Sequence, residues 1–354
     1  MSHAYSISLI ACLIYLVIKW YATQKIRYPI LIGLVAGMIL LVRPLNLLFL
    51  PLILFWGVGS WLALRDRTRF LLNSWKQILF LFLAATVVLI PQFFYWHLTT
   101  GQFIYYSYGE ERFFFHQPHI LQGIFGYRKG WLVYTPVMIF AILGAFVTFK
   151  RYRSLFMPMV IIVLAYIYFI FSWWAWWYGG GFGLRAMIDS YALLAFPLTA
   201  FTAWILQKKP GIRIIYLIVI GTFLSLNVFQ TYQYYTGAIH WDAMTRQAYW
   251  DSFLREKPSM DFKNLLEHPD YELAKKGITG FTKYGKGQNP FSGTSDTTGM
   301  AAFIKQAELT IRNDSAWYEL VLTKSIKKNK PIEEILHEEA LWIWHKKNEK
   351  AVTE

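Results

Sequence analysis

The stretch GLVAGMILLVRPLNLLFLPLILFW, residues 33–56, lies inside an apolar run of 37 residues that extends from 28 to 64. A helix of that length would measure roughly 55 Å at about 1.5 Å per residue, whereas the core of a bilayer is roughly 30 Å thick. A charge followed by a proline, Arg43-Pro44, lies near the middle of the run, and proline ends or kinks a helix. The stretch therefore predicts two membrane-spanning helices joined by a tight turn.

Apolar runs of similar length recur on both sides of this hairpin. We predict eight spans, approximately at residues 5–19, 28–43, 45–64, 78–97, 131–149, 155–177, 189–206 and 214–232. The composition agrees, because 56% of residues are hydrophobic and 16% are charged, against about 25% charged in an ordinary soluble domain. The predicted fold class is an all-α polytopic membrane protein in the lipid bilayer, with a small, mostly helical extramembrane tail at the C-terminus.

Basic residues divide unevenly between alternate loops. One set of loops holds thirteen: Lys19, Lys25, Arg27, Arg65, Arg67, Arg69, Lys76, Lys150, Arg151, Arg153, Lys208, Lys209 and Arg213. The other set holds five: Arg43, Arg112, Arg128, Lys129 and Arg185. Because cytoplasmic loops carry the excess of Lys and Arg, the first set is predicted to face the cytoplasm. We therefore expect a multi-pass protein of the bacterial inner membrane whose tail lies on the non-cytoplasmic side.

The net charge of +14 comes entirely from the hydrophobic part of the chain. Residues 1–233 hold 18 of the 35 Lys and Arg but four of the 21 acids, which leaves 17 charges of each sign in the tail. The excess is spread over short loops and forms no continuous basic face, so a nucleic-acid partner is not predicted. The single cysteine, Cys12, lies in an apolar run, which excludes a disulfide framework and a thiolate metal site.

Three regions follow from these patterns. Residues 1–233 are the transmembrane region, 234–299 an extramembrane linker region and 300–354 a helical tail. A loop is predicted at 277–300, which is rich in Gly, Ser, Thr, Asn and Pro. Helical periodicity in the tail places apolar residues on two faces: Trp317, Leu320 and Val321 on one, and Ile332, Ile335, Leu336, Ala340 and Ile343 on the other.

The first predicted helix begins about five residues after Met1, with its basic flank at the C-terminal end. A signal peptide has its charges before the apolar run, so this helix is not one. We expect that the chain is the C-terminal part of a larger membrane protein; a short translocated N-terminus is the alternative.

The segment SWWAWWYGGGFGLR, residues 172–185, is the most unusual on the predicted outer side. Its tryptophans are typical of an aromatic belt, although indole faces also stack on sugars, and Tyr178 is a candidate substrate contact. Arg185 and Asp189 would share a helical face and pair. This pair either fixes the loop or serves substrate, in which case the planar fork of Arg185 suits a phosphate.

The long loop that precedes the fifth predicted span gathers further charges. Glu110 and Glu111 could activate a hydroxyl, while Arg128 and Lys129 could hold an anion; solvated loop charge is the alternative. His116 and His119 resemble half a metal site, but no matching ligand cluster accompanies them, so no metal site is predicted. No cofactor is predicted either, and a divalent metal stays open. Arg43 at the hairpin tip is either a snorkelling anchor or a substrate ligand.

Together these segments resemble a known family. The run at 33–56, GYRKGWLVYTPVM at 126–138 and WWYGGGFGLRAMIDSYALLAFPL at 176–198 are similar to bacterial membrane glycosyltransferases of the GT-C superfamily. Within it, the chain resembles protein O-mannosyltransferases and aminoarabinose lipid A transferases (family 39-like). The resemblance covers most of residues 1–250.

The resemblance implies a polyprenyl-phosphate sugar donor and transfer, with inversion, to a protein or lipid acceptor on the non-cytoplasmic face. It places Arg185 near the lipid phosphate, with Asp189, Tyr178, Arg128, Lys129, Glu110 and Arg43 as further substrate-binding candidates. The family's general base lies in an earlier external loop, so we expect it upstream of Met1, with Glu110 or Asp189 as the fallback. A non-catalytic membrane anchor and a lipid or solute transporter are the alternative functions.

Overall fold

The structure is a computed structural model that describes residues 2–278, 280–283, 308, 311–312, 315–328 and 330–351. The chain divides into two compact units, Met1–Tyr284 and Gly285–Glu354. The α-helices described in the first unit are α1 (Ser2–Thr23), α2 (Arg27–Val42), α3 (Leu52–Phe55), α4 (Trp61–Asn73), α5 (Trp75–Thr100), α6 (Ile120–Phe125), α7 (Trp131–Tyr134), α8 (Ile139–Arg151), α9 (Arg153–Phe171), α10 (Tyr191–Leu206), α11 (Pro210–Thr236), α12 (Arg246–Ser252) and α13 (Tyr271–Lys275).

Shorter elements complete the first unit. Its 3₁₀ helices are η1 (Pro44–Phe49), η2 (Pro136–Met138), η3 (Arg185–Ser190) and η4 (Phe262–Leu265). The strands β1 (Glu267–Pro269) and β2 (Phe281–Lys283) pair antiparallel, with Glu267 opposite Lys283. The residues that the structure describes are mostly helical, as predicted, and this two-stranded sheet and an isolated bridge between Phe113 and Trp173 are the extended structure among them.

Five helical segments in the described part of the chain are long and apolar enough to cross a membrane. They are Ser2–Thr23, Trp75–Thr100, Arg153–Phe171, Arg185–Leu206 and Pro210–Thr236. This finding supports association with a membrane. The other three predicted spans differ: α2 is an apolar helix of 16 residues, while 45–64 and 131–149 are interrupted by 3₁₀ helices that begin at Pro44 and Pro136. The structure therefore does not establish eight spans.

The interrupted segment 44–60 is sheltered by protein, which explains how an apolar run can tolerate broken helix. Helix α3 ends at Phe55, so the last carbonyls of this segment lack the intrahelical donors that lipid could not replace. The Tyr21 hydroxyl donates to the Ile53 carbonyl at 2.5 Å, and Arg67 donates to the Trp56 carbonyl at 3.0 Å. The Arg67 guanidinium also lies 3.3 Å from the centre of the Tyr21 ring. Side chains from neighbouring helices thus replace the missing helical hydrogen bonds.

Glycines set the closest helix contacts in the bundle. A Cβ atom added to Gly33 of α2 would lie 2.1 Å from the Leu81 carbonyl oxygen of α5, and one added to Gly144 of α8 would lie 1.8 Å from the Pro197 carbonyl oxygen of α10. Small residues of this kind let membrane helices approach backbone to backbone. The pairs α2–α5 and α8–α10 are accordingly the two most extensive helix contacts.

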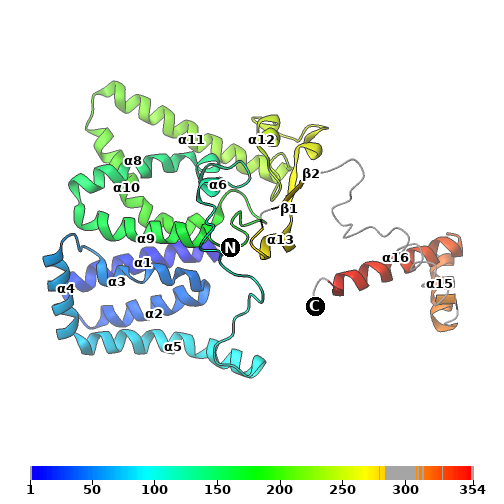
Figure 1. Ribbon diagram of the computed structural model, residues 1–354, viewed down its shortest axis with the longest axis horizontal. Helices are drawn as coiled ribbons and strands as arrows, with labels where there is room; N and C mark the ends of the chain where they lie inside the picture. Colours follow the sequence, from blue (N-terminus) through cyan, green and yellow to red (C-terminus); the bar gives the residue numbers. More distant parts are fainter. Residues whose placement is uncertain are drawn as a thin grey trace. The chain divides into compact units, whose positions relative to one another are not determined.

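The long helices run roughly side by side, so the loops gather at two ends (Figure 1). One end carries α4 and the loops with thirteen basic residues. The other end carries the start of α1, the loop at 101–119, and α12, α13 and the small sheet (Figure 1). The two predicted sets of loops thus lie at opposite ends of the bundle.

Within the first unit, the residues that follow α11 fold back onto the helix bundle. Buried Ile239, Met244, Tyr249 and Phe262 form one apolar cluster with Tyr134 of α7. Residues 234–283, predicted to lie in a linker region, therefore have a packed core of their own against the bundle.

The second unit contains α15 (Ser315–Lys328) and α16 (Ile332–Ala351), within the predicted helical tail. Ile311, Val321, Ile335 and Leu336 form its described core. Leu320 differs from the expected pattern, because 59% of its surface is exposed. The predicted loop at 277–300 lies outside the described residues except for 277–278 and 280–283.

Candidate functional site

A cavity of about 490 Å³ is lined by residues of four parts of the chain. These parts meet at the end of the bundle that carries the start of α1 (Figure 1). They are η1, the loop at 101–119, the end of α9 and the segment that follows it. The lining residues are Arg43, Pro44, Leu45, Leu47, Leu48, Tyr106, Tyr108, Glu111, Phe113, Phe169, Trp173 and Tyr178. One cation, one carboxylate and four hydroxyl- or indole-bearing rings therefore face the same space as an apolar surface from η1 and α9.

The loop at 101–119 is held against the segment after α9 by backbone pairing. The amide of Phe114 donates to the Ser172 carbonyl at 2.6 Å, and the amide of Trp174 donates to the Arg112 carbonyl at 3.2 Å. Next to this pairing, the Trp174 indole N–H donates to Oε2 of Glu111 at 3.0 Å. The pairing fixes the Glu111 carboxylate on the cavity wall.

Arg43 enters the cavity because of the proline that follows it. Pro44 disfavours helical geometry at the preceding residue, and Arg43 is extended, with φ −157° and ψ 113°. Its side chain is 20% exposed and lies 3.4 Å from Oδ2 of Asp189, which is fully buried. The buried carboxylate thus balances the charge of Arg43 and holds its guanidinium at the cavity.

His3 completes the network behind Arg43. Its Nδ1 lies 2.8 Å from Oδ1 of Asp189, and its Nε2 lies 2.8 Å from Nη1 of Arg43. Nη1 of Arg43 also lies 2.7 Å from Nδ1, so the imidazole contacts both the guanidinium and the carboxylate. The Tyr166 hydroxyl, 3.2 Å from Oδ2 of Asp189, adds a further polar contact. Both carboxylate oxygens of Asp189 are therefore occupied by protein groups.

The expected pairing of Arg185 with Asp189 is not present. The segment Arg185–Ser190 is a 3₁₀ helix, and at about three residues per turn, residues four apart are rotated by roughly one third of a turn. Arg185 is consequently exposed while Asp189 is buried. The sequence had suggested an α-helix here, which would have brought the two side chains together.

Arg128 and Lys129 lie in a second, buried cluster. Arg128 donates to the Asp242 carbonyl at 2.7 Å, and the Lys129 ammonium donates to the Gly181 carbonyl. Oδ2 of Asp242 accepts from the Tyr271 hydroxyl at 2.6 Å. Burial lowers the pKa of Lys129 to about 8. The cluster joins the glycine turn at 179–183 to the residues that follow α11.

The two adjacent glutamates have different surroundings. Glu110 is exposed and does not line the cavity, whereas Glu111 does. Tyr178, another predicted contact, lines the cavity in a left-handed backbone conformation with φ 47°. Such a conformation costs free energy for a residue other than glycine, and Gln24 and Leu254 also adopt it, away from this cavity.

Several residues of the site were not expected from the sequence. His3 carried no signal, because it meets Arg43 and Asp189 only after folding. Tyr106 and Tyr108 lie in the predicted outer loop, but nothing in their spacing separated them from the loop's other aromatic residues. Among the described residues, no group of three or more His, Cys, Asp or Glu is arranged to hold a metal.

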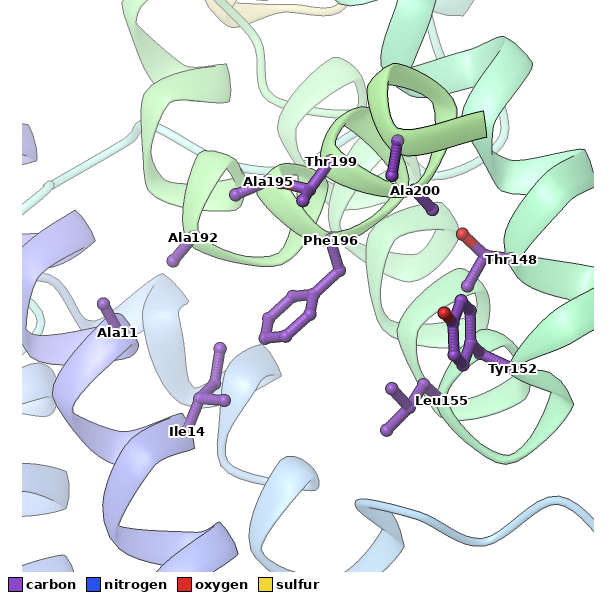
Figure 2. Close-up of a pocket in the computed structure, with 11 residues that line it drawn as sticks. Ala11, Ile14, Thr148, Tyr152, Leu155, Ala192, Ala195, Phe196, Thr199 and Ala200 are labelled. Atoms are coloured by element: carbon purple, nitrogen blue, oxygen red, sulfur yellow. The ribbon is translucent and has the colours of Figure 1, made fainter. Parts of the chain in front are cut away.

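A further cavity, of about 510 Å³, lies between α1, α10 and the junction of α8 with α9. Figure 2 shows Ala11 and Ile14 of α1 on one side, Thr148 and Tyr152 on the other, and Phe196 of α10 between them. Its lining contains hydroxyls but no charged side chain. It therefore suits a donor phosphate less well than the cavity that Arg43 lines.

No protein-family model, curated protein or solved structure matches this chain. The resemblance to GT-C glycosyltransferases accordingly stays a prediction.

Proposed function

We propose that this chain is a membrane glycosyltransferase, or part of one, that moves a sugar from a polyprenyl-phosphate donor to a protein or lipid acceptor. The bundle would cross a bacterial inner membrane eight times, with the cavity of Arg43 and Glu111 at the non-cytoplasmic face. The observation that carries the proposal is this cavity, where a guanidinium backed by a buried carboxylate faces a carboxylate, aromatic rings and an apolar floor.

Arg43 is the group best suited to the donor phosphate. A guanidinium binds phosphate oxygens through two charge-assisted hydrogen bonds, and Asp189 with His3 restrains Arg43 from the protein side. The polyprenyl chain would follow the apolar residues of η1 and α9 that line the same cavity. Arg185, the earlier candidate, is exposed and is absent from the lining.

The sugar would lie against the rings that line the cavity, and Glu111 would act as general base. Its carboxylate takes the proton of the acceptor hydroxyl while that oxygen bonds to the anomeric carbon. The bond from the anomeric carbon to the phosphate oxygen breaks, and polyprenyl phosphate leaves with the electron pair, held by Arg43. Attack opposite the leaving group inverts the anomeric centre.

The location of the charges argues against the transporter alternative. Transporters carry ionisable groups near the membrane midplane, often at helix breaks. In the described bundle, Arg43, Asp189, Glu111 and His3 all lie at one end, near the start of α1. This arrangement favours chemistry at a membrane face.

Donor binding tests the proposal directly. A fluorescent short-chain polyprenyl phosphate is titrated into the purified chain in detergent, and into Arg43→Ala, Arg43→Lys and Arg185→Ala. Arg43→Ala should weaken binding about 10- to 100-fold, as expected for losing hydrogen bonds between charged groups, with Arg43→Lys intermediate. Arg112→Ala, an exposed arginine of the neighbouring loop, is the matched control. A loss confined to Arg185→Ala would move the donor phosphate to the glycine turn and contradict the assignment.

A further inference from the structure

A third cavity lies at the opposite, cation-rich end of the bundle. Its volume is about 580 Å³, within the range of about 300–1,000 Å³ that is typical of ligand sites. It is lined by Leu48, Pro51, Phe55, Val58, Gly59, Ser60, Trp61, Leu64, Met157, Pro158, Ile161, Ile162 and Ala165. Apart from Ser60 and the Trp61 indole, these side chains are apolar, so the cavity requires an apolar occupant.

Two arginines adjoin the cavity wall. Arg65 follows Leu64 and lies four residues after Trp61, so it shares a helical face with Trp61. Its side chain is 53% exposed and makes a loose ion pair, 3.7 Å long, with the exposed Asp66. Arg153, also exposed, precedes Ser154, whose Cα would lie 2.7 Å from a Cβ atom at Gly59. Neither arginine is part of the lining, and the Arg153 guanidinium lies 5.7 Å from the centre of the Phe149 ring. Both arginines are thus next to the cavity by their backbone positions, and their exposed side chains are free to turn toward its rim.

Helix α4, which forms one wall of this cavity, is placed as a helix at a membrane surface would be. It runs across the ends of the long helices at the end of the bundle (Figure 1), and none of its residues is buried. Trp61 is 79% and Leu72 70% exposed. Exposed tryptophan, leucine and arginine side chains along one short helix fit a position at the level of the lipid headgroups, where aromatic rings gather and arginines snorkel. The rim of the cavity is therefore expected at that level.

We propose that this cavity binds an anionic glycerophospholipid. One acyl chain fills the space between α3, the start of α4 and α9, while Arg65 and Arg153 bind the phosphate-bearing headgroup. Charge complementarity selects this occupant, because a neutral lipid would fill the apolar cavity without using the two arginines. The site shares Leu48 with the donor cavity but none of its charged groups. It does not depend on the proposed transferase activity.

The main competing occupant is the donor's own polyprenyl chain. Leu48 lines both this cavity and the cavity of Arg43, so a long chain could extend from one to the other. The experiment must therefore distinguish a phospholipid from a polyprenyl tail.

Spin-labelled phosphatidylglycerol and phosphatidylcholine are titrated separately into the delipidated full chain in detergent, and bound lipid is measured by electron paramagnetic resonance. Phosphatidylglycerol should bind more tightly. Arg65→Gln and Arg153→Gln should each reduce this preference about fivefold, because one basic residue near a membrane surface contributes about 1 kcal/mol. Ala165→Phe should weaken the binding of both lipids, because the larger side chain fills the cavity. Lys209→Gln, an exposed lysine of another loop at the same end, is the matched control and should change nothing.

Three results would overturn the proposal. Equal affinity for the two lipids would show that the site does not select an anionic headgroup. If Lys209→Gln lowered the preference as much as the arginine variants do, the preference would come from the general surface charge at that end of the bundle. Displacement of phosphatidylglycerol by short-chain polyprenyl phosphate, abolished in Arg43→Ala, would assign the cavity to the donor. Polyprenyl phosphate binding in the double variant Arg65→Gln/Arg153→Gln is measured in parallel and should be unchanged, so the two proposals can fail independently.

Discussion

Oδ2 of Asp189 lies 3.4 Å from Nη1 of Arg43, at the point where η3 meets the turn between α2 and η1. The carboxylate is fully buried, while the guanidinium reaches the cavity with a side chain that is 20% exposed. The ion pair thus joins a buried charge that stabilises the fold, Asp189, to a charge that faces the cavity, Arg43. The same substitution should therefore affect stability and binding.

Asp189→Asn should lower the free energy of unfolding by about 3 kcal/mol, because it leaves the Arg43 charge without its buried partner. This value is the lower end of the range for breaking a buried ion pair, since Arg43 keeps some exposure. The measurement is the apparent unfolding midpoint in detergent. Asp66→Asn, which removes an exposed pair, is the control and should have little effect. Equal midpoints for the two variants would mean that the buried pair adds nothing.

Glu111→Gln should reduce sugar transfer about 10²- to 10⁴-fold, the usual contribution of a general base. Glu110→Gln is the matched control, because Glu110 is exposed and does not line the cavity. Turnover is followed with a radiolabelled sugar on a polyprenyl-phosphate donor and a mixed pool of acceptors. If only Glu110→Gln lost activity, the base would lie outside the described cavity.

The free energy of unfolding should rise between about pH 8 and pH 10.5 because of Lys129. Burial lowers its pKa from 10.5 to about 8, so in this window the unfolded chain binds a proton that the folded chain has released. The rise should be on the order of 2 kcal/mol at pH 9.5. Comparing unfolding midpoints at pH 7.5 and 9.5 tests this. Lys129→Met should abolish the difference and Lys209→Met should retain it; the reverse pattern would exclude Lys129 as its source.

Gly33→Ala and Gly144→Ala should each destabilise the bundle by about 1–3 kcal/mol through overpacking. In both cases the new Cβ atom would meet a backbone carbonyl oxygen of the neighbouring helix, at 2.1 Å and 1.8 Å. Gly221→Ala in α11 is the control, since nothing lies within 4 Å of its added Cβ. That variant should be neutral or stabilising by up to about 1 kcal/mol. Similar melting of all three variants would show that the helices can separate without cost.

The long helices were predictable from the sequence because the length of an apolar run depends only on consecutive residues. Segments 44–60 and 131–138 were not, since composition does not reveal that Tyr21 and Arg67 can satisfy the carbonyls freed by a break. Pro44, Pro51 and Pro136 were the available signals.

The sequence predicted several residues of the site but not which of them contact each other. Arg43, Asp189 and Tyr178 were named from the sequence, but the partner given to Asp189 was wrong. Spacing of four residues implies contact in an α-helix and not in a 3₁₀ helix, and the switch to 3₁₀ geometry at Arg185 has no clear local marker. His3 meets its partners through tertiary packing alone, which one sequence does not reveal.

The membrane orientation is still a prediction from loop charge, and cysteine labelling tests it. Cysteines are introduced at exposed positions 69 and 117 on a Cys12→Ala background. An impermeant thiol reagent applied to intact cells should label position 117 and not 69, because the end with thirteen basic residues is expected to face the cytoplasm. Permeabilised cells provide the control, in which both should react. Labelling of 69 alone in intact cells would invert the orientation.

Leu48 has a consequence for the behaviour of the molecule as a whole. It contributes to the walls of two cavities that open toward opposite ends of the bundle, and it belongs to the short 3₁₀ helix that directly follows Arg43. Occupants of the two cavities would therefore share one side chain across the thickness of the bundle. Any change in donor affinity caused by a bound phospholipid would have to be matched by an equal change in phospholipid affinity caused by the donor, because binding linkage is reciprocal. Lipid composition on one side of a membrane would then influence the saturation of a site on the other.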